Sequence, residues 1–203
     1  MNKIIRIIAI PVVVLWLASC TVSRVYPVRY YEENKLKLHE TETLYGQATK
    51  NKALAIAISN LDFSSLSLEL KTDTVRYIYD FDWAEPRMQD TLLRYGYDTS
   101  LVTRILENMR TMRSTWINSM DHYIDGKKQN LFFISAPVRQ FSIFPPMQKR
   151  KYYLFNFYRQ PQYYDAEGRL LDKRKLKQLR KINNEIFYRI NDRVCYTISG
   201  KFR

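Results

Sequence analysis

The stretch 52-KALAIAISNLDFSSLSLELKTDTVRYIYDF-81 decides the fold class of this chain. Over residues 53–58, leucine and isoleucine alternate with alanine. Over residues 66–70 and 75–81, apolar residues alternate with small, polar or charged ones, with Ile78 as an exception. A period of two is typical of β-strands that bury one face. The stretch therefore predicts three consecutive strands.

Helical signals follow this stretch. Pro86 fits the first turn of a short helix that ends near Gly96, and Asp98 fits the N-cap of a second helix. Apolar residues then recur at helical spacing from Leu101 to about Ile124. We therefore expect one long helix over residues 98–124.

The second half of the chain returns to strand patterns. Residues 131–135, 138–144 and 152–158 read as strands, residues 172–191 as a helix, and residues 194–198 as a final strand. The whole pattern predicts an α+β fold: a mainly antiparallel sheet of five to seven strands with two main helices packed on one face. Strands and helices do not alternate strictly, which argues against a doubly wound parallel sheet.

The helix expected at residues 172–191 has two chemically different arcs. At 100° per residue, one arc is apolar and the opposite arc is basic. The basic arc holds Lys173, Arg174, Lys177, Arg180 and Lys181. These cations fall in the N-terminal half of the helix, where the helix dipole disfavours positive charge. We therefore predict a partner-binding surface, extended by the basic residues 149–151, with a solvated face as the alternative.

Signals for catalysis are weak. Asp80, Asp82 and Glu85 form the one tight group of carboxylates, which a divalent cation or a general acid/base pair could use. His39 and His122 stand in no metal-ligand motif, and the chain has no nucleophile, phosphate-binding or dinucleotide-binding motif. We expect no catalytic residue, no metal and no cofactor.

The N-terminus carries the strongest functional signal. Lys3 and Arg6 precede an apolar run over residues 7–18. This run is too short to span about 30 Å of hydrocarbon, which takes ~20 helical residues. It ends in Leu17-Ala18-Ser19-Cys20, which resembles the signal peptide of bacterial lipoproteins, where an aliphatic and two small residues precede an obligatory cysteine. A plain signal anchor is the alternative.

The resemblance covers residues 1–20 only and implies a lipid anchor. Cys20 would receive a diacylglycerol, the chain would be cut before it, and the new amino group would be acylated, for example with palmitate. Acyl chains contribute about 0.8 kcal/mol per buried CH₂, so two or three of them hold a protein at a membrane. Thr21 in place of Asp after the cysteine implies the outer membrane of a Gram-negative envelope, and we expect the periplasmic face.

The anchor divides the chain and limits its partners. We expect a signal peptide at 1–19, the lipidated cysteine and a tether at 20–34, and a single globular domain at 35–203. Because the signal removes Lys3 and Arg6, residues 20–203 carry 31 Lys and Arg against 20 Asp and Glu. Such charge favours nucleic acid, which the envelope location excludes. The remaining partners are acidic envelope proteins, lipid headgroups and anionic glycans.

The second cysteine, Cys195, would be the one thiol left after lipidation, so an intramolecular disulfide is excluded. A lone cysteine in a strand is typically a small buried hydrophobe, although a histidine folded beside it would make it a nucleophile. The sequence thus predicts a non-enzymatic docking or accessory subunit of an envelope assembly. The alternatives are a binding module for anionic glycan or lipid, and a small envelope hydrolase that uses residues 80–85.

Overall fold

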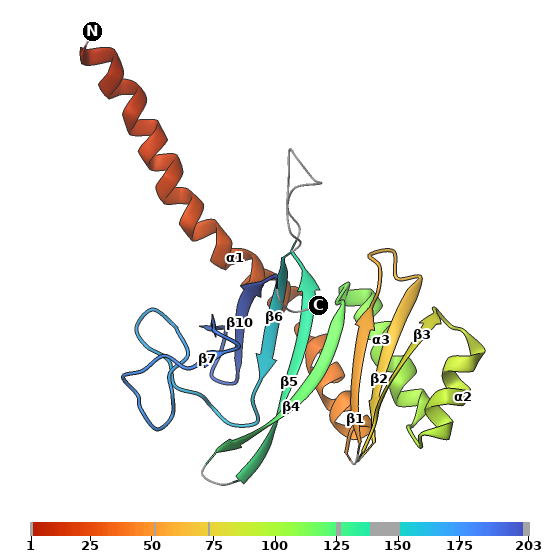
Figure 1. Cartoon of the computed structure of the whole chain (residues 1–203). Coiled ribbons are helices and arrows are strands. Elements are labelled where there is room, and N and C mark those ends of the chain that lie inside the picture. Colours follow the sequence, from red (N-terminus) through yellow and green to blue (C-terminus); the bar gives the residue numbers. More distant parts are fainter. Residues whose placement is uncertain (1, 51, 73, 125–126, 139–150, 201–203) are drawn as a thin grey trace. The chain divides into compact units, whose positions relative to one another are not determined.

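The computed structural model describes residues 2–50, 52–72, 74–124, 127–138 and 151–200 (Figure 1). It divides into two compact units, residues 1–35 and residues 36–203. The first unit is the N-terminal part of helix α1 (Asn2–Ala48). Residues 21–34, which belong to the predicted tether, are therefore helical. Ion pairs one turn apart, such as Arg29 with Glu33 at 2.7 Å, support this conformation.

The second unit contains the predicted three-stranded stretch. β1 (Ala53–Ile58), β2 (Ser65–Lys71) and β3 (Arg76–Asp82) pair antiparallel in chain order, which confirms the prediction. The register places Ile56 opposite Leu68 and Leu68 opposite Tyr79, so one face of the three strands is apolar. Apart from Ile78, which lies opposite Glu69, small and polar side chains occupy the other face because side chains alternate along a strand.

Two helices follow with the predicted start signals. α2 (Pro86–Arg94) has proline in its first turn and is followed by Gly96, whose φ of +69° lies in the left-handed region. α3 (Thr99–Met112) has Asp98 as its N-cap. The Asp98 carboxylate accepts hydrogen bonds from the backbone N–H groups of Ser100, at 2.9 Å, and Leu101, at 3.2 Å.

The prediction of one long helix to Ile124 was wrong. Arg113 ends α3 in the left-handed conformation, with a φ of 54°, and residues from Trp116 onward form strand β4 (Trp116–Ile124). Thr115 receives a backbone hydrogen bond from Ile58 and donates one to Ser135, so the chain joins the sheet immediately after the helix. The helical spacing of the apolar residues beyond Met112 is therefore coincidental.

The remaining strands widen the sheet. β5 (Lys127–Pro137), β6 (Tyr152–Phe157) and β10 (Val194–Ser199) confirm the strands predicted at 131–135, 152–158 and 194–198. With the short β9 (Tyr188–Arg189), they give an eight-stranded antiparallel sheet in the order β3-β2-β1-β4-β5-β6-β10-β9. Of the strand predicted at 138–144, all but Val138 lies outside the described residues.

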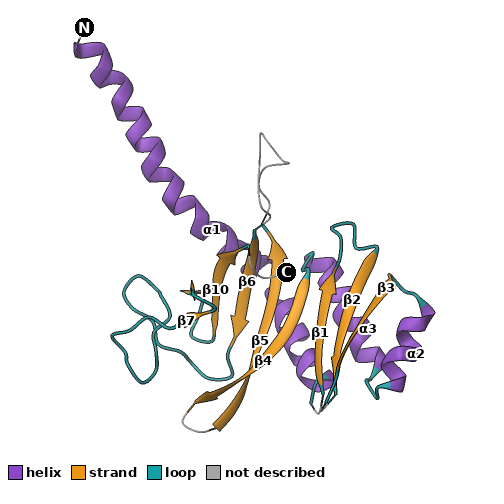
Figure 2. Cartoon of the chain, in the orientation of Figure 1, coloured by secondary structure: helices purple, strands orange, loops and turns teal. Residues whose placement is uncertain are grey.

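The fold is α+β with an antiparallel sheet, as predicted, although the sheet has eight strands rather than five to seven and a third helix is present. The helices of residues 36–203 lie on one face of the sheet (Figure 2). Tyr45 of α1 contacts Phe132, and Tyr95 after α2 contacts Tyr79. The strand register places Phe132 and Tyr79 on the same face, so these helices share a core.

The segment between β6 and β10 covers part of the opposite face. Leu170, Ile182 and Phe187 pack there in a buried cluster with strand residues that include Phe133 and Cys195. The helix predicted at 172–191 was wrong, because this segment is built from isolated bridges and two-residue strands. β7 (Lys181–Ile182) and β8 (Glu185–Ile186) form a hairpin closed by two asparagines.

Candidate functional site

The five predicted partner-binding cations lie on or beside a loop. The segment 172–181, called the cationic loop below, contains six Lys and Arg residues and one carboxylate. Of the predicted cations, Lys173, Arg174, Lys177 and Lys181 are exposed, and Arg180 is half-buried. Because this segment is not helical, the two-arc arrangement and the argument from the helix dipole do not apply. The cations are nevertheless brought together on one surface segment.

Local hydrogen bonds give the cationic loop its shape. The carboxylate of Asp172 accepts hydrogen bonds from the backbone N–H groups of Arg174, at 2.8 Å, and Lys175, at 3.2 Å. Such turns are characteristic of aspartate because its short side chain reaches the backbone two residues ahead. The N–H of Asp172 donates to the carbonyl of Gln178 at 2.9 Å, which closes the loop at its base.

The end of the cationic loop is attached to the buried cluster. The Arg180 N–H donates to the Leu170 carbonyl at 2.9 Å, and the Arg180 guanidinium lies 5.7 Å from the centre of the Tyr158 ring. A cation at this distance over an aromatic face is attracted to the ring. Arg180 therefore has a structural role, whereas Lys173, Arg174 and Lys177 are exposed. Leu176, 53% exposed, adds an apolar group between them.

The carboxylates considered for metal binding or catalysis have separate local partners. Asp80 accepts a hydrogen bond from the Ser67 hydroxyl, and Glu85 pairs with Arg87 at 2.8 Å. Within the part of the chain that the structure describes, no three His, Cys, Asp or Glu side chains gather closely enough to hold a metal ion. The arrangement of residues 80–85 is that of a strand end and a turn.

Cys195 is fully buried in β10, on the face covered by the segment between β6 and β10. Burial raises the pKa of its thiol to about 12, so the reactive thiolate is scarce at neutral pH. The surroundings of Cys195 therefore match the buried hydrophobe that the sequence favoured.

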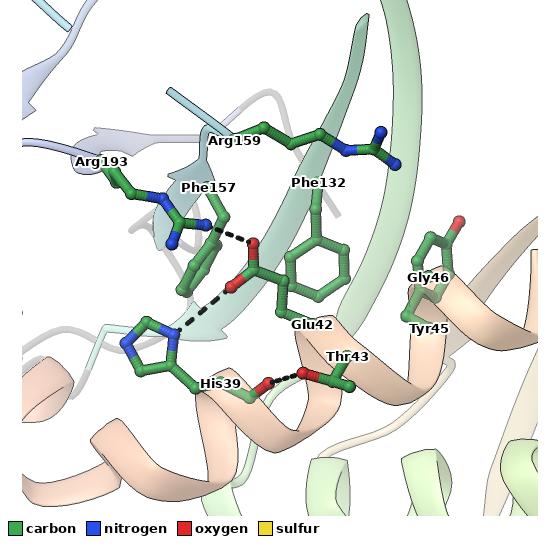
Figure 3. A pocket seen from close by; sticks show the side chains of 9 residues that line it. All are labelled: His39, Glu42, Thr43, Tyr45, Gly46, Phe132, Phe157, Arg159 and Arg193. Carbon is green, nitrogen blue, oxygen red and sulfur yellow. Dashed lines mark hydrogen bonds and ion pairs between the residues drawn. The ribbon is translucent and has the colours of Figure 1, made fainter. Parts of the chain in front are cut away.

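The two histidines are separated in the fold. His122 belongs to β4, in the part of the chain where the helix over residues 98–124 was predicted. His39 lies on α1 and lines a pocket of about 340 Å³ together with Glu42, Arg159 and Arg193 (Figure 3). Sequence reasoning identified His39 but missed the other three. The spacing of His39 and Glu42, three apart on a helix, was a local signal, whereas no pattern relates them to Arg159 or Arg193.

Cys20, the residue predicted to carry the lipid, falls within α1. Within the described residues, no helix combines the length and the apolar composition that crossing a membrane requires. No family model, curated protein or solved structure matches this chain.

Proposed function

We propose that this protein is a lipid-anchored component of a bacterial cell envelope that docks onto an acidic envelope protein through its cationic loop. In this proposal, Cys20 carries the lipid, residues 36–203 form the docking unit, and the protein catalyses no reaction. The expected location is the periplasmic face of the outer membrane.

The exposed cations of the loop are the observation that supports docking. Lys173, Arg174 and Lys177 are solvent-exposed on a segment whose turn is closed by hydrogen bonds. An ordered cationic surface favours encounter with an acidic partner and fixes its orientation. The exposed Leu176 gives the same surface an apolar contact, which attraction to an anionic glycan would not use.

The order of the N-terminal features supports the anchor. Two basic residues, an apolar run and Leu17-Ala18-Ser19-Cys20 follow one another as in lipoprotein signals. Metabolic labelling with an alkyne fatty acid tests this part. We expect wild type and Cys195→Ala to be labelled and Cys20→Ala to be unlabelled. Label retained on Cys20→Ala would refute the lipid anchor.

Docking is tested by charge removal with a matched control. The test variant replaces Lys173, Arg174 and Lys177 by Gln and keeps Arg180, which packs on Tyr158. The control variant replaces three exposed cations elsewhere. These are Lys50, Lys71 and Arg94. Both variants lose three positive charges, so a difference in binding between them shows that the position of the charges matters.

The readout is binding to the partner recovered by crosslinking in intact cells, measured over a series of salt concentrations. If each exposed cation contributes about 0.5 kcal/mol, three of them change the affinity by about tenfold at low salt. We expect the test variant to lose this affinity and part of the salt dependence, and the control to retain both. Equal losses in the two variants would refute docking through the loop. Binding to anionic vesicles or glycan, but to no protein, would favour the alternative of a lipid- or glycan-binding module.

A further inference from the structure

The pocket of about 340 Å³ between α1 and the sheet has a lining suited to a small ligand. His39, Glu42, Thr43 and Gly46 line it from α1, and Phe132 and Phe157 line it from β5 and β6. Sites for small molecules occupy about 300–1,000 Å³ and combine apolar walls with a few placed polar groups. This pocket lies at the lower end of that range.

Glu42 is held between two partners at the pocket wall. One carboxylate oxygen lies 3.3 Å from Nδ1 of His39, and the other accepts a hydrogen bond from Arg193 at 3.3 Å. Arg193 also donates from Nε to the Tyr158 carbonyl at 2.8 Å. The charges of Glu42 and Arg193 therefore offset each other, and both side chains are held in place before any ligand binds.

Arg159 supplies a positive charge that the rest of the lining does not offset. Glu42 is the one carboxylate among the described residues that line the pocket, and it is paired with Arg193. Arg159 extends over the pocket on the side of Phe132, away from that pair (Figure 3). A guanidinium presents several N–H donors in a plane, which matches the two oxygens of a carboxylate. The pocket is thus suited to one anionic group.

The remainder of the pocket suits a compact body with hydroxyl groups. The rings of Phe132 and Phe157, with centres 5.3 Å apart, form an apolar wall. Glu42, His39 and the Thr43 hydroxyl offer hydrogen-bonding atoms around it. Gly46 contributes no side chain, and the space where its Cβ would project is open. A sugar ring presents both a C–H face and hydroxyl groups, so it would use both kinds of surface.

We infer that this pocket binds a small hydroxylated carboxylic acid of the uronic acid class. Its carboxylate would bind Arg159, its hydroxyl groups would bind Glu42 and His39, and its C–H face would contact Phe132 and Phe157. A phosphorylated sugar shares the hydroxyl groups but carries close to two negative charges, for which the lining offers one uncompensated cation.

Ligand titration of the full-length chain in detergent micelles, followed by NMR, tests the inference. The probes are glucuronate, glucose and glucose 6-phosphate. We expect glucuronate to bind at least about tenfold more tightly than glucose, since a charged hydrogen bond is lost with the carboxylate. Arg159→Gln should lose the same factor of about ten, whereas Arg94→Gln, an exposed arginine on α2, should bind as wild type.

A second variant tests the cavity without changing its charge. Gly46→Leu places a side chain in the open space beside Glu42 and should abolish binding of glucuronate while Arg159 remains. Thermal melting checks that both variants fold. Three results would overturn the inference: no binding of glucuronate by wild type, equal binding by wild type and Arg159→Gln, or tighter binding of glucose 6-phosphate than of glucuronate.

Discussion

Replacing Asn183 and Asn184 by alanine tests the structure of the segment that includes the cationic loop. In the hairpin of β7 and β8, these residues have φ angles of 50° and 64°. Two consecutive residues with positive φ are characteristic of the type I′ turn, which joins two-residue hairpins. Asparagine tolerates this conformation better than alanine does because its side chain bonds the local backbone.

The magnitude follows from these angles. The left-handed conformation costs an alanine roughly 1–2 kcal/mol. Allowing for the smaller cost that asparagine already bears, we expect the double variant to lose about 2 kcal/mol of unfolding free energy. A helix would respond in the opposite direction, because alanine is favoured over asparagine by roughly 0.6 kcal/mol per helical position. A hairpin and a helix at residues 181–186 therefore predict changes of opposite sign in the free energy of unfolding.

Urea denaturation followed by tryptophan fluorescence measures the effect. Ile182 and Phe187 flank the turn and are buried in the cluster against which Trp116 packs. Loss of the hairpin should therefore change the fluorescence of Trp116. Asn184→Gly serves as the control, since glycine adopts a positive φ without steric cost and should be neutral or stabilising. A double alanine variant that is more stable than wild type would refute the hairpin and support a helix.

Three further predictions concern the core, the titrating groups and the pocket wall. Leu38→Ala should cost about 2–5 kcal/mol in urea denaturation because Leu38 is fully buried, whereas Leu36→Ala, at an 87% exposed position, should cost nothing measurable. Burial raises the pKa values of Tyr97 and Cys195 to about 12. In the unfolded chain the pKa values of tyrosine and cysteine are about 10 and 8.5. The stability that the two buried, protonated side chains contribute is therefore complete below these values and is lost as the pH rises towards 12. The urea midpoint should therefore fall steadily above about pH 9, and a constant midpoint would contradict the buried protonated state. Gly46→Ala should stabilise the protein by up to about 1 kcal/mol and so raise its melting temperature, because the added methyl group enters open space beside a helix. A lower melting temperature would show that this space is filled.

The part of the fold from β1 to the start of α3 could be predicted because its signals are local, whereas the helical residues 36–48 were not predicted. Alternating residues form strands over 53–82, and Pro86 and Asp98 begin helices by satisfying the needs of a helix N-terminus. These features depend on neighbouring residues alone. The antiparallel pairing was predicted because strands and helices do not alternate strictly along the chain.

The two wrong helices show where local signals fail. After Met112, apolar residues continue at helical spacing, but the backbone of Thr115 pairs with β1 and β5, and this long-range pairing decides the structure. In residues 172–191, the apolar spacing predicted a helix, whereas Asn183 and Asn184 form the turn of a hairpin. Consecutive asparagines tolerate positive φ, which a helix does not allow.

The candidate sites were predictable to different degrees. The cations of the cationic loop could be found because they are close in sequence, although their predicted helical arrangement was wrong. The pocket could not be found, because Glu42 and Arg193 come together through the packing of α1 on strands that are formed much later in the chain. A contact of this kind depends on tertiary structure, and no spacing in the sequence records it.

The strand order of the sheet has a consequence for how the chain folds. Strands that follow one another in the chain pair in two groups: β1 with β2 and β2 with β3, and then β4 with β5 and β5 with β6. A chain that emerges N-terminus first can therefore close each of these hairpins as soon as it is synthesised or exported. β6 is one exception, because its second neighbour, β10, follows β7, β8 and β9 in the chain. β1 is the other, because its second neighbour is β4, which arrives only after α2 and α3. Until then the three-stranded intermediate has two open edges, so chains interrupted before β4 should be the aggregation-prone species.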